Sequence, residues 1–508
     1  MAADSDACVP KALTDFVFDL YDSVTLSHIA EEQKRLYNSD FRDLSSKYFA
    51  STPWPSPQTI ATECNGDPLF LALYRELTHR HWHAVSRINI RDRMEGWQVY
   101  RELFEEILQE EPNFYITPGW AFDILNEFVY QFQGFCQFRT NLHSNAVKYG
   151  LIKEGESFGS VNSSGPAPPQ NVIDNINMLT SADAWEVEQV FSYLHRLVKI
   201  GITSERPAYQ YLGLFASVAL SRLECLLGDY SASLKALMPI SDAIVVKKDD
   251  TEHTAVEIIQ SVFLARLSMA YHAGISFMML RRYKDASRIW GDICAYMQRG
   301  FKTGQLRKLP NSDQFNKQYE RMISLLAIVT HICPPAGTVE ESILRTIREK
   351  HGPILSKIDA GEEGYEDLFM CPKFVTASFD NVYKLQMRAF SKEMAPQHAC
   401  RKLRSYMKLY TSVAVSKLAK FNDMEVDDFV PLLISYKYRM LQPEAPESNM
   451  FTDDATSKSA LDIHYYLVED LVHVDEAEKE RRFEKYFVGQ ISQNAEILGD
   501  AMAINTTI

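Results

Sequence analysis

The stretch TSVAVSKLAKFNDMEVDDFVPLLISYKYRM, residues 411–440, carries the clearest structural signal in the chain. Its first half gathers apolar side chains before an acidic break at Asp423. Its second half repeats apolar residues at spacings of three, one and three: Phe429, Leu432, Leu433 and Tyr436. These spacings are typical of a helix with one buried face. The stretch therefore predicts two short helices joined by a tight turn.

Two alternating segments follow these helices. LDIHYYLV (461–468) and LVHVDE (471–476) alternate apolar and polar residues, and Glu469 and Asp470 form an acidic turn between them. Alternation with a period of two across a short turn predicts a pair of strands. Helix, turn, helix and a two-stranded wing together predict a winged helix, a fold that often holds nucleic acid but can also hold other proteins.

Composition limits the class of protein. The chain has 508 residues, which favours several folded units, and its 46% hydrophobic and 24% charged residues are ordinary for a globular protein. The net charge of −14 shows that the chain is not organised overall to bind phosphates. It begins without the pattern of a secretion signal, has no apolar run of membrane-spanning length, and scatters its eight cysteines without a C-x-x-C motif. We expect a cytoplasmic protein with reduced thiols and no membrane partner.

Two segments in the middle of the chain resemble each other. Residues 211–237 and 263–293 each read as a helix, a turn and a second helix. An aromatic residue follows each turn and a small residue comes three positions later, with corresponding positions 53 residues apart: Tyr230 and Tyr283, Ser233 and Ala286. This is how tetratricopeptide-like hairpins pack. The pattern predicts a right-handed α-solenoid, a stack of helix pairs that offers a long surface to partners.

The rest of the chain completes a mostly α-helical organisation. Residues 120–139 are apolar around most of a helix, which predicts a central core helix. The Gly/Ser/Pro-rich run at 154–169 predicts a flexible linker. The last helix has an apolar seam with charged flanks, which suits a helical bundle with partner chains. The predicted organisation is an N-terminal helical region (1–153), a flexible linker or loop (154–183), TPR-like helical repeats (184–400), a winged helix (401–477) and a terminal bundle helix (478–508).

Motifs for catalysis are missing from the sequence. There is no P-loop, dinucleotide-binding, nucleophile-elbow or HExxH motif. His79 and His83 share a helical face, but His81 points away and no third metal ligand stands at a suitable spacing. Cys400 beside two cationic residues has no visible His–Asn partnership. We therefore predict that the chain is not an enzyme and holds no metal or cofactor.

Basic residues gather around the helix-turn-helix. Residues 384–440 contain eleven Lys/Arg against five Asp/Glu, an excess of six positive charges in an acidic chain. Asp427 and Asp428 begin the second helix, where a DNA-reading helix presents its N-terminus, so we expect no DNA contact. A weak RNA contact stays open, as does a merely solvated surface. The candidate RNA-contacting residues are Arg401, Lys402, Arg404, Lys417 and Lys420.

Helical repeats followed by a winged helix resemble the PCI module of the proteasome lid, the COP9 signalosome and eukaryotic translation initiation factor 3. Eight blocks narrow this resemblance to the family of subunit L of the initiation factor. They occur in order from about residue 45 to 480: STPWPSP, FLALYRELTHRH, WAFDILNEFVYQFQGFCQFR, LLGDYSASLKAL, MMLRRYKDASRIW, NKQYERMISLLAI, YEDLFMCPKF and RSYMKLYTSVAVSKLAKFNDMEVDDF.

The resemblance implies a non-catalytic scaffold that supports mRNA recruitment and pre-initiation complex formation on the small ribosomal subunit. Such subunits join through their PCI winged helices into an arc of β-hairpins, and their C-terminal helices form a bundle. The implied neighbours are subunits K and E and the PCI core. The interface residues that we predict are Ile463, Tyr465, Leu467, Val472, Phe483, Phe487 and Ile491. The alternatives are a PCI subunit of a proteasome lid or COP9 type of assembly, an RNA-binding module and an unrecognised hydrolase.

Overall fold

The protein is described by a computed structural model that divides into two compact units. The first comprises Met1–Leu280, Cys371–Arg388 and Ala445–Asp454, and the second comprises Arg281–Met370, Ala389–Glu444 and Ala455–Ile508. The residues that the structure describes are 10–26, 30–109, 111–153, 158, 169–181, 183–241, 245–248, 251–309, 311–333, 337–360, 362, 364–371, 382–444, 451, 456–459, 463–476, 487, 490–491 and 494.

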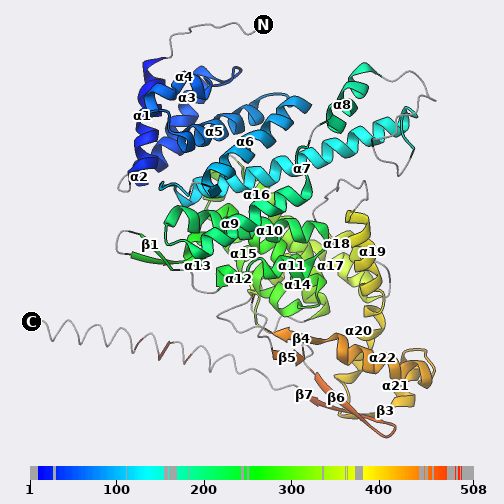
Figure 1. Ribbon diagram of the computed structural model, residues 1–508. Coiled ribbons are helices and arrows are strands. Elements are labelled where there is room, and N and C mark those ends of the chain that lie inside the picture. Colours follow the sequence, from blue (N-terminus) through cyan, green and yellow to red (C-terminus); the bar gives the residue numbers. More distant parts are fainter. Residues whose placement is uncertain are drawn as a thin grey trace, which may run out of the picture. The chain divides into compact units, whose positions relative to one another are not determined.

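The first unit is built almost wholly of helices (Figure 1), which confirms the predicted mostly α-helical fold. Its elements are α1 (Lys11–Thr25), α2 (Ala30–Arg35), the π-helix η1 (Leu36–Asp40), α3 (Phe41–Tyr48), α4 (Pro57–Ile60), the 3-10 helix η2 (Ala61–Cys64), α5 (Pro68–Val85), α6 (Ile90–Gln109), α7 (Pro118–Lys148), α8 (Gln170–Ser181), α9 (Val187–Thr203), α10 (Pro207–Leu227), α11 (Tyr230–Lys235), α12 (Met238–Ser241), β1 (Val245–Lys248), β2 (Thr251–Thr254), α13 (Ala255–Ser261) and α14 (Phe263–Met279).

The second unit contains the remaining elements, except that α19 (Val382–Met394) contributes residues to both units. These elements are α15 (Tyr283–Lys302), the 3-10 helix η3 (Leu306–Lys308), α16 (Ser312–Ile332), α17 (Glu341–Asp359), α18 (Tyr365–Leu368), α20 (Gln397–Met407), β3 (Ser412–Ala414), α21 (Val415–Phe421), α22 (Val426–Arg439), β4 (Leu441–Glu444), β5 (Thr456–Ser459), β6 (Ile463–Val468) and β7 (Leu471–Glu476).

The predicted core helix forms α7, which is longer at both ends than expected. Trp120 and Phe128 on this helix are fully buried. Phe128 lies in a cluster of aromatic rings from α6 and from the residues just before α9, with ring centroids 5.0 Å from Phe104 and 5.4 Å from Trp185. Burial of several large aromatic side chains supplies much of the favourable free energy of folding. The apolar circumference seen in the sequence is therefore used for packing.

The first predicted repeat forms α10 and α11. Gly228 adopts a φ of +93° at the turn, a conformation that glycine adopts without strain. Ser233, the small residue of the pattern, is fully buried. Its hydroxyl lies 3.0 Å from the Ser221 hydroxyl on α10 and accepts a hydrogen bond of 2.9 Å from Ser276 on α14. A small side chain at this position lets three helices approach one another. The helices and turn of the second repeat form α14 and α15, as predicted.

Helices α9 and α10 approach each other through glycine. A Cβ atom added to Gly201 would lie 2.6 Å from the Cα atom of Gly213, and one added to Gly213 would lie 2.7 Å from the Cα atom of Gly201. Because the atoms met are backbone, no side-chain rotation can relieve such a clash. The two helices are therefore held at a distance that only glycine permits.

We expect Gly213→Ala to lower the free energy of unfolding by about 1–3 kcal/mol, because the added methyl group forces the two backbones apart. Gly119→Ala is the matched control in the same unit, since a Cβ atom there meets no atom within 4 Å. The control should change stability by less than about 1 kcal/mol. Urea unfolding followed by circular dichroism measures both variants, and equal midpoints would contradict the packing argument.

The predicted linker at 154–183 is wrong in its second half. Residues Gln170–Ser181 form α8, and Val172 and Ile176 are buried against Leu142 and Ala146 of α7. The spacing of four between the two apolar residues places them on one helical face, which gives the segment a core to join. Most of the Gly/Ser/Pro-rich run lies outside the described residues.

Two hairpins were not expected from the sequence: β1 with β2, and β4 with β5. Of the predicted terminal helix, the described residues are 487, 490, 491 and 494, and all four are helical. No single helix in the described ranges is long and apolar enough to cross a bilayer, although α13 and α14, bent by 110° at their junction, reach that length and apolarity together.

Candidate interaction surfaces of the winged helix

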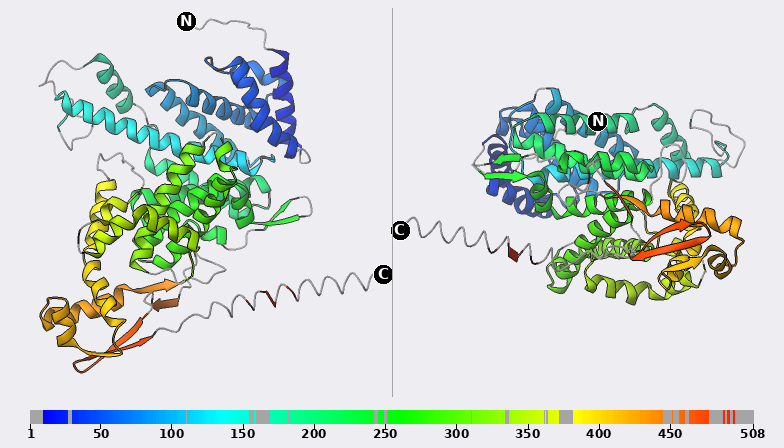
Figure 2. Two further views of the ribbon diagram at one scale, coloured as in Figure 1. Left: turned by 180° about the vertical axis from the view of Figure 1, so that it is seen from behind. Right: turned by 90° about the horizontal axis from the view of Figure 1, so that it is seen from below.

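The predicted winged helix is present in the second unit. Strands β6 and β7 pair as an antiparallel hairpin in which Tyr465 lies opposite Val474, and β3 pairs with the other edge of β7. The strand order is therefore β3-β7-β6. Helices α21 and α22 are joined by a turn in which Asp423 has a φ of +54° and the Met424 amide donates to the Ala419 carbonyl. Figure 1 shows the three strands beside the two helices, and Figure 2 shows them from behind and from below.

The inner face of the wing belongs to the core. Ile463, Tyr465 and Val472 are buried, as are Phe429 and Leu433 on α22. The Tyr465 hydroxyl donates a hydrogen bond of 2.7 Å to the Leu433 carbonyl, and the Lys437 ammonium donates one of 2.9 Å to the Tyr465 carbonyl. These two bonds fix strand β6 to helix α22.

This arrangement corrects the predicted interface. Of the four wing residues singled out in the sequence, Ile463, Tyr465 and Val472 face inward and have no surface to offer a partner. Leu467 lies near the tip of the hairpin, and 42% of it is exposed. Alternation in the sequence showed which residues share a face of the wing, but the more apolar face turned out to be the buried one.

The outer face of the wing presents apolar residues that the sequence pattern did not single out. We define the outer wing face as Tyr466, Val468, Leu471 and His473. The first three are 42–48% exposed. The rings of Tyr466 and His473 stack across the hairpin with centroids 5.4 Å apart. Among the described residues, no strand pairs with the free edge of β6. An apolar face beside an unpaired strand edge is suited to binding another chain.

Helix α22 adds a second exposed apolar surface. Val426, Ile434 and Tyr438 recur at multiples of four residues and are 39%, 49% and 69% exposed. In a DNA-binding winged helix, the corresponding helix enters the major groove. Here the exposed side chains of Asp427 and Asp428 occupy its first turn, where they stabilise the positive end of the helix dipole and would repel DNA phosphates. The composition of this face therefore suits a protein partner better than DNA.

The remaining predicted site residues lie apart from the wing core. Phe487 and Ile491 are exposed, and Phe483 falls outside the described residues. Of the RNA candidates, Lys402, Lys417 and Lys420 are exposed and Arg404 is half-buried, while the side chain of Arg401 also lies outside the described part.

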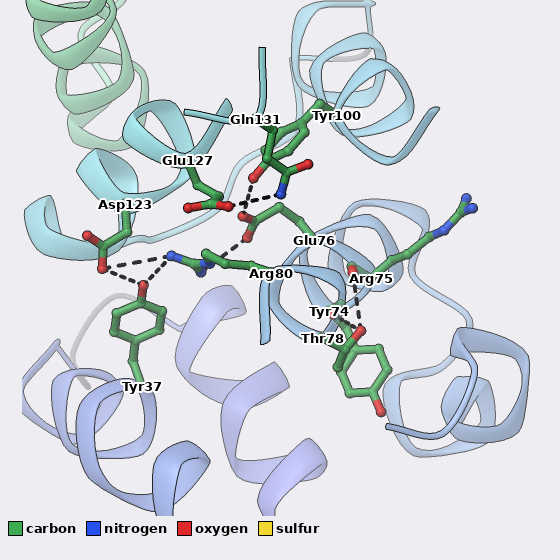
Figure 3. Close-up of polar contacts among 10 residues, drawn as sticks. All are labelled: Tyr37, Tyr74, Arg75, Glu76, Thr78, Arg80, Tyr100, Asp123, Glu127 and Gln131. Atoms are coloured by element: carbon green, nitrogen blue, oxygen red, sulfur yellow. Dashed lines mark hydrogen bonds and ion pairs between the residues drawn. The ribbon is translucent and has the colours of Figure 1, made fainter. Parts of the chain in front are cut away.

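A buried polar network lies in the first unit (Figure 3). Arg80 donates a hydrogen bond of 2.7 Å to the Tyr37 hydroxyl, which in turn donates one of 2.7 Å to Asp123. A second Arg80 nitrogen lies 3.2 Å from a carboxylate oxygen of Glu76, whose other oxygen accepts a bond of 3.1 Å from Tyr100. Together these residues tie α5 to the N-terminal helices, α6 and α7.

Burial dominates the electrostatics of this network. It raises the pKa of Glu76 to about 7, and the nearby Arg80 cation only partly opposes the rise. Burial also lowers the pKa of both His79 and His83 to about 4, with Arg75 adding to the effect at His79. No group of three His, Cys, Asp or Glu residues within the described ranges is placed to hold a metal ion. We interpret the network as internal packing.

The neutral His79 gives a testable pH dependence. Its folded-state pKa of about 4 lies below the ordinary value of 6.5. Between these two pH values, the unfolded chain binds a proton that the folded chain does not. The free energy of unfolding therefore decreases as the pH falls from 6.5 towards about 4. Between about pH 7.5 and about pH 5, we expect His79 to account for roughly 2 kcal/mol of lost stability. In His79→Gln, the decrease measured by urea unfolding should be smaller by that amount. The exposed His195→Gln variant is the control, and an unchanged pH dependence in His79→Gln would refute this assignment.

Comparisons with known proteins show the family of this chain. The sequence profile of the family described as RNA polymerase I-associated factor PAF67 matches residues 92–494. Eukaryotic translation initiation factor 3 subunit L of Nematostella vectensis is 28% identical over 534 residues, which covers 98% of this chain and 94% of that protein. The Homo sapiens and Bos taurus proteins of the same name are each 30% identical over 501 residues, covering 91% of this chain and 82% of theirs. The chain therefore belongs to the family of eukaryotic translation initiation factor 3 subunit L.

Proposed function

We propose that this chain is a non-catalytic scaffold subunit of the eukaryotic translation initiation factor 3 complex. The relatives that match along nearly the whole chain carry the name of that subunit. The structural observation that carries the proposal is the winged helix, whose outer wing face and α22 surface are apolar and exposed. In this role the chain acts in the cytoplasm and supports mRNA recruitment and pre-initiation complex formation on the small ribosomal subunit.

Assembly through the wing has a direct physical basis. The free edge of β6 has backbone donors and acceptors that a strand of a neighbouring subunit can pair with. Leu467 and the outer wing face can then be buried beside that strand, which removes apolar area from water. Ile463, Tyr465 and Val472 contribute indirectly, because they hold β6 in place from inside.

The finer assignments follow from the family resemblance. We propose that residues 401–477 are a PCI winged helix, that residues 478–508 join the bundle of C-terminal helices, and that subunits K and E are neighbours. The exposed Phe487 and Ile491 support the bundle role, because apolar side chains one turn apart form a seam that a partner helix can cover. A winged helix alone also fits a subunit of the proteasome lid or COP9 signalosome type. Similarity over 91–98% of the chain favours the initiation factor.

Charged substitutions test whether the outer wing face binds other subunits. Val468 and Leu471 lie opposite each other in the hairpin and are 48% and 43% exposed. We expect the double variant Val468→Asp/Leu471→Asp to reduce co-purification of other initiation factor 3 subunits by at least roughly tenfold, because carboxylates in an apolar interface each cost more than 1 kcal/mol. The measurement is quantitative mass spectrometry after affinity purification of the tagged chain.

A matched control separates assembly from folding. Leu309→Asp/Leu385→Asp introduces the same charges at positions that are 42% and 53% exposed and lie outside the winged helix. The control should co-purify its partners normally, and both variants should melt like the unmodified chain. Normal co-purification of a folded Val468→Asp/Leu471→Asp chain would count against assembly through the outer wing face.

A further inference from the structure

An aromatic cluster joins helices α20 and α21 at the start of the winged helix. The ring of Phe421 lies 5.0 Å from that of Tyr406 and 6.5 Å from that of Tyr410, measured between centroids. The planes of Phe421 and Tyr410 differ by only 23°. All three side chains are half-buried, so parts of them remain accessible to solvent. We call these three residues the aromatic platform.

One lysine contacts the aromatic platform, and two more lie close to it in the sequence. The Lys417 ammonium lies 5.0 Å from the Tyr410 ring centroid and 5.7 Å from that of Phe421, within the range of a cation–π interaction. Lys417 and Lys420 precede Phe421 by four and one residues on α21, and Lys402 precedes Tyr406 by one helical turn on α20. All three lysines are exposed.

The charge of this segment differs sharply from that of the chain. Residues 394–422 contain six Lys/Arg and no Asp or Glu, although the whole chain has a net charge of −14. The basic residues are Arg401, Lys402, Arg404, Lys408, Lys417 and Lys420. A local excess of positive charge of this kind favours contact with polyanions.

From this juxtaposition we propose that the aromatic platform and its lysines bind a single-stranded polynucleotide. Proteins that bind single strands combine aromatic side chains, on which bases stack, with cationic groups that contact the phosphates. A duplex keeps its base faces stacked inside and cannot use the platform. An acidic protein segment would satisfy the lysines but would leave the aromatic faces without a matching planar group, so the polynucleotide is the better fit.

The test uses the purified full-length chain and a fluorescein-labelled oligouridylate of about twelve nucleotides, a length suited to a single-strand site. Fluorescence anisotropy gives the Kd over a range of salt concentrations. Lys417→Glu/Lys420→Glu should weaken binding at least roughly tenfold and reduce the slope of log Kd against log salt by about 0.7 for each phosphate that the variant no longer neutralises. The control Lys308→Glu/Lys317→Glu changes two exposed lysines elsewhere in the same unit and should leave Kd and slope unchanged.

A second pair of variants tests stacking separately from charge. Tyr410→Leu should weaken binding by about tenfold because it removes a stacking surface, whereas Tyr410→Phe should stay within about twofold of the unmodified chain. Thermal melting checks that each variant is folded. A parallel oligodeoxythymidylate shows whether the strand is RNA or DNA, and either result supports the proposal.

Four results would overturn it. The first is equal binding by Lys417→Glu/Lys420→Glu and the control pair. The second is no salt-dependent binding by the unmodified chain. The third is equally tight binding of duplex RNA that none of the variants weakens. The fourth is loss of a co-purifying protein from the charge-reversed variant while its affinity for the oligonucleotide stays the same, because that outcome identifies the surface as a protein contact.

Discussion

Arg80→Met is expected to lower the free energy of unfolding by about 3–5 kcal/mol at about pH 8, where Glu76 is ionised. The Arg80 guanidinium contacts Glu76, Tyr37 and Asp123, with distances of 3.2, 2.7 and 3.8 Å. Glu76 is fully buried, so its carboxylate cannot turn to water when the cation is removed. An uncompensated charge in the core is one of the few single changes with an effect of this size.

The loss of stability should also depend on pH. Burial raises the pKa of Glu76 to about 7 from an ordinary 4.5. Between pH 4.5 and about pH 7, the folded state therefore binds one more proton than the unfolded chain. The free energy of unfolding decreases as the pH rises through this range. Protonation neutralises the carboxylate that Arg80→Met leaves unpaired. The effect of Arg80→Met should therefore be smaller at about pH 5.5 than at about pH 8.

Two controls sharpen this experiment. Glu76→Gln/Arg80→Met removes both charges and should recover part of the stability that Arg80→Met loses. Arg348→Met breaks an ion pair with Glu341 in which both side chains are about two-thirds exposed, and it should change stability by less than about 1 kcal/mol. Urea unfolding followed by tryptophan fluorescence gives all three values. A loss below about 1 kcal/mol in Arg80→Met would show that the network is not a buried charge centre.

Tyr465→Ala should destabilise the second unit by about 3–5 kcal/mol, as expected for truncating a buried aromatic side chain. Tyr465 is only 3% exposed, and its hydroxyl is bonded to the Leu433 carbonyl on α22. Its removal leaves a cavity between the wing and the helix and a buried carbonyl without its donor. Tyr465→Phe keeps the ring and loses only the hydrogen bond, so it should cost about 1 kcal/mol.

Amide hydrogen exchange locates this effect. In Tyr465→Ala, peptides covering β6, β7 and α22 should lose protection, while peptides from α5–α7 in the first unit keep theirs. In Tyr465→Phe, protection should change little. An unchanged exchange pattern in Tyr465→Ala would mean that the residue is not part of the winged-helix core, and a direct partner contact by Tyr465 would regain support.

Periodicity was sufficient to predict helices α21 and α22, strands β6 and β7, and the helices of the two repeats. Strand β3 was missed, because it lies where the sequence predicted the start of the first helix. Two further features carry local signals in the sequence. Gly228, with its positive φ, marks the α10–α11 turn. Asp67 marks the start of the helix that begins at Pro68, because its side chain accepts a hydrogen bond from the Phe70 amide as an N-cap should. The faces of the wing could not be assigned in the same way. The period-two alternation places Tyr465 and Tyr466 on opposite faces of the wing. Which of the two faces is buried depends on the packing of α22 against the wing, and this tertiary contact cannot be predicted from the alternation.

Other features depend on residues far apart in the sequence. Tyr37, Arg80 and Asp123 meet only after three helices have packed, so no local pattern marks the network in advance. Strand β4 contains Pro443 and pairs with the polar residues of β5, a combination that propensity does not favour for strands. The buried residues of α8 gain their stability from α7, and the sequence of the segment alone does not show that partner.

We propose that the winged helix fixes this chain into initiation factor 3. The most direct measurement is affinity purification of the tagged full-length chain from eukaryotic cells at moderate salt, with every co-purifying chain identified and quantified by mass spectrometry. We expect the other initiation factor 3 subunits in constant proportion, with subunits K and E among those kept at the highest salt. Recovery of proteasome-lid or COP9 signalosome subunits instead, or of the chain alone, would contradict it.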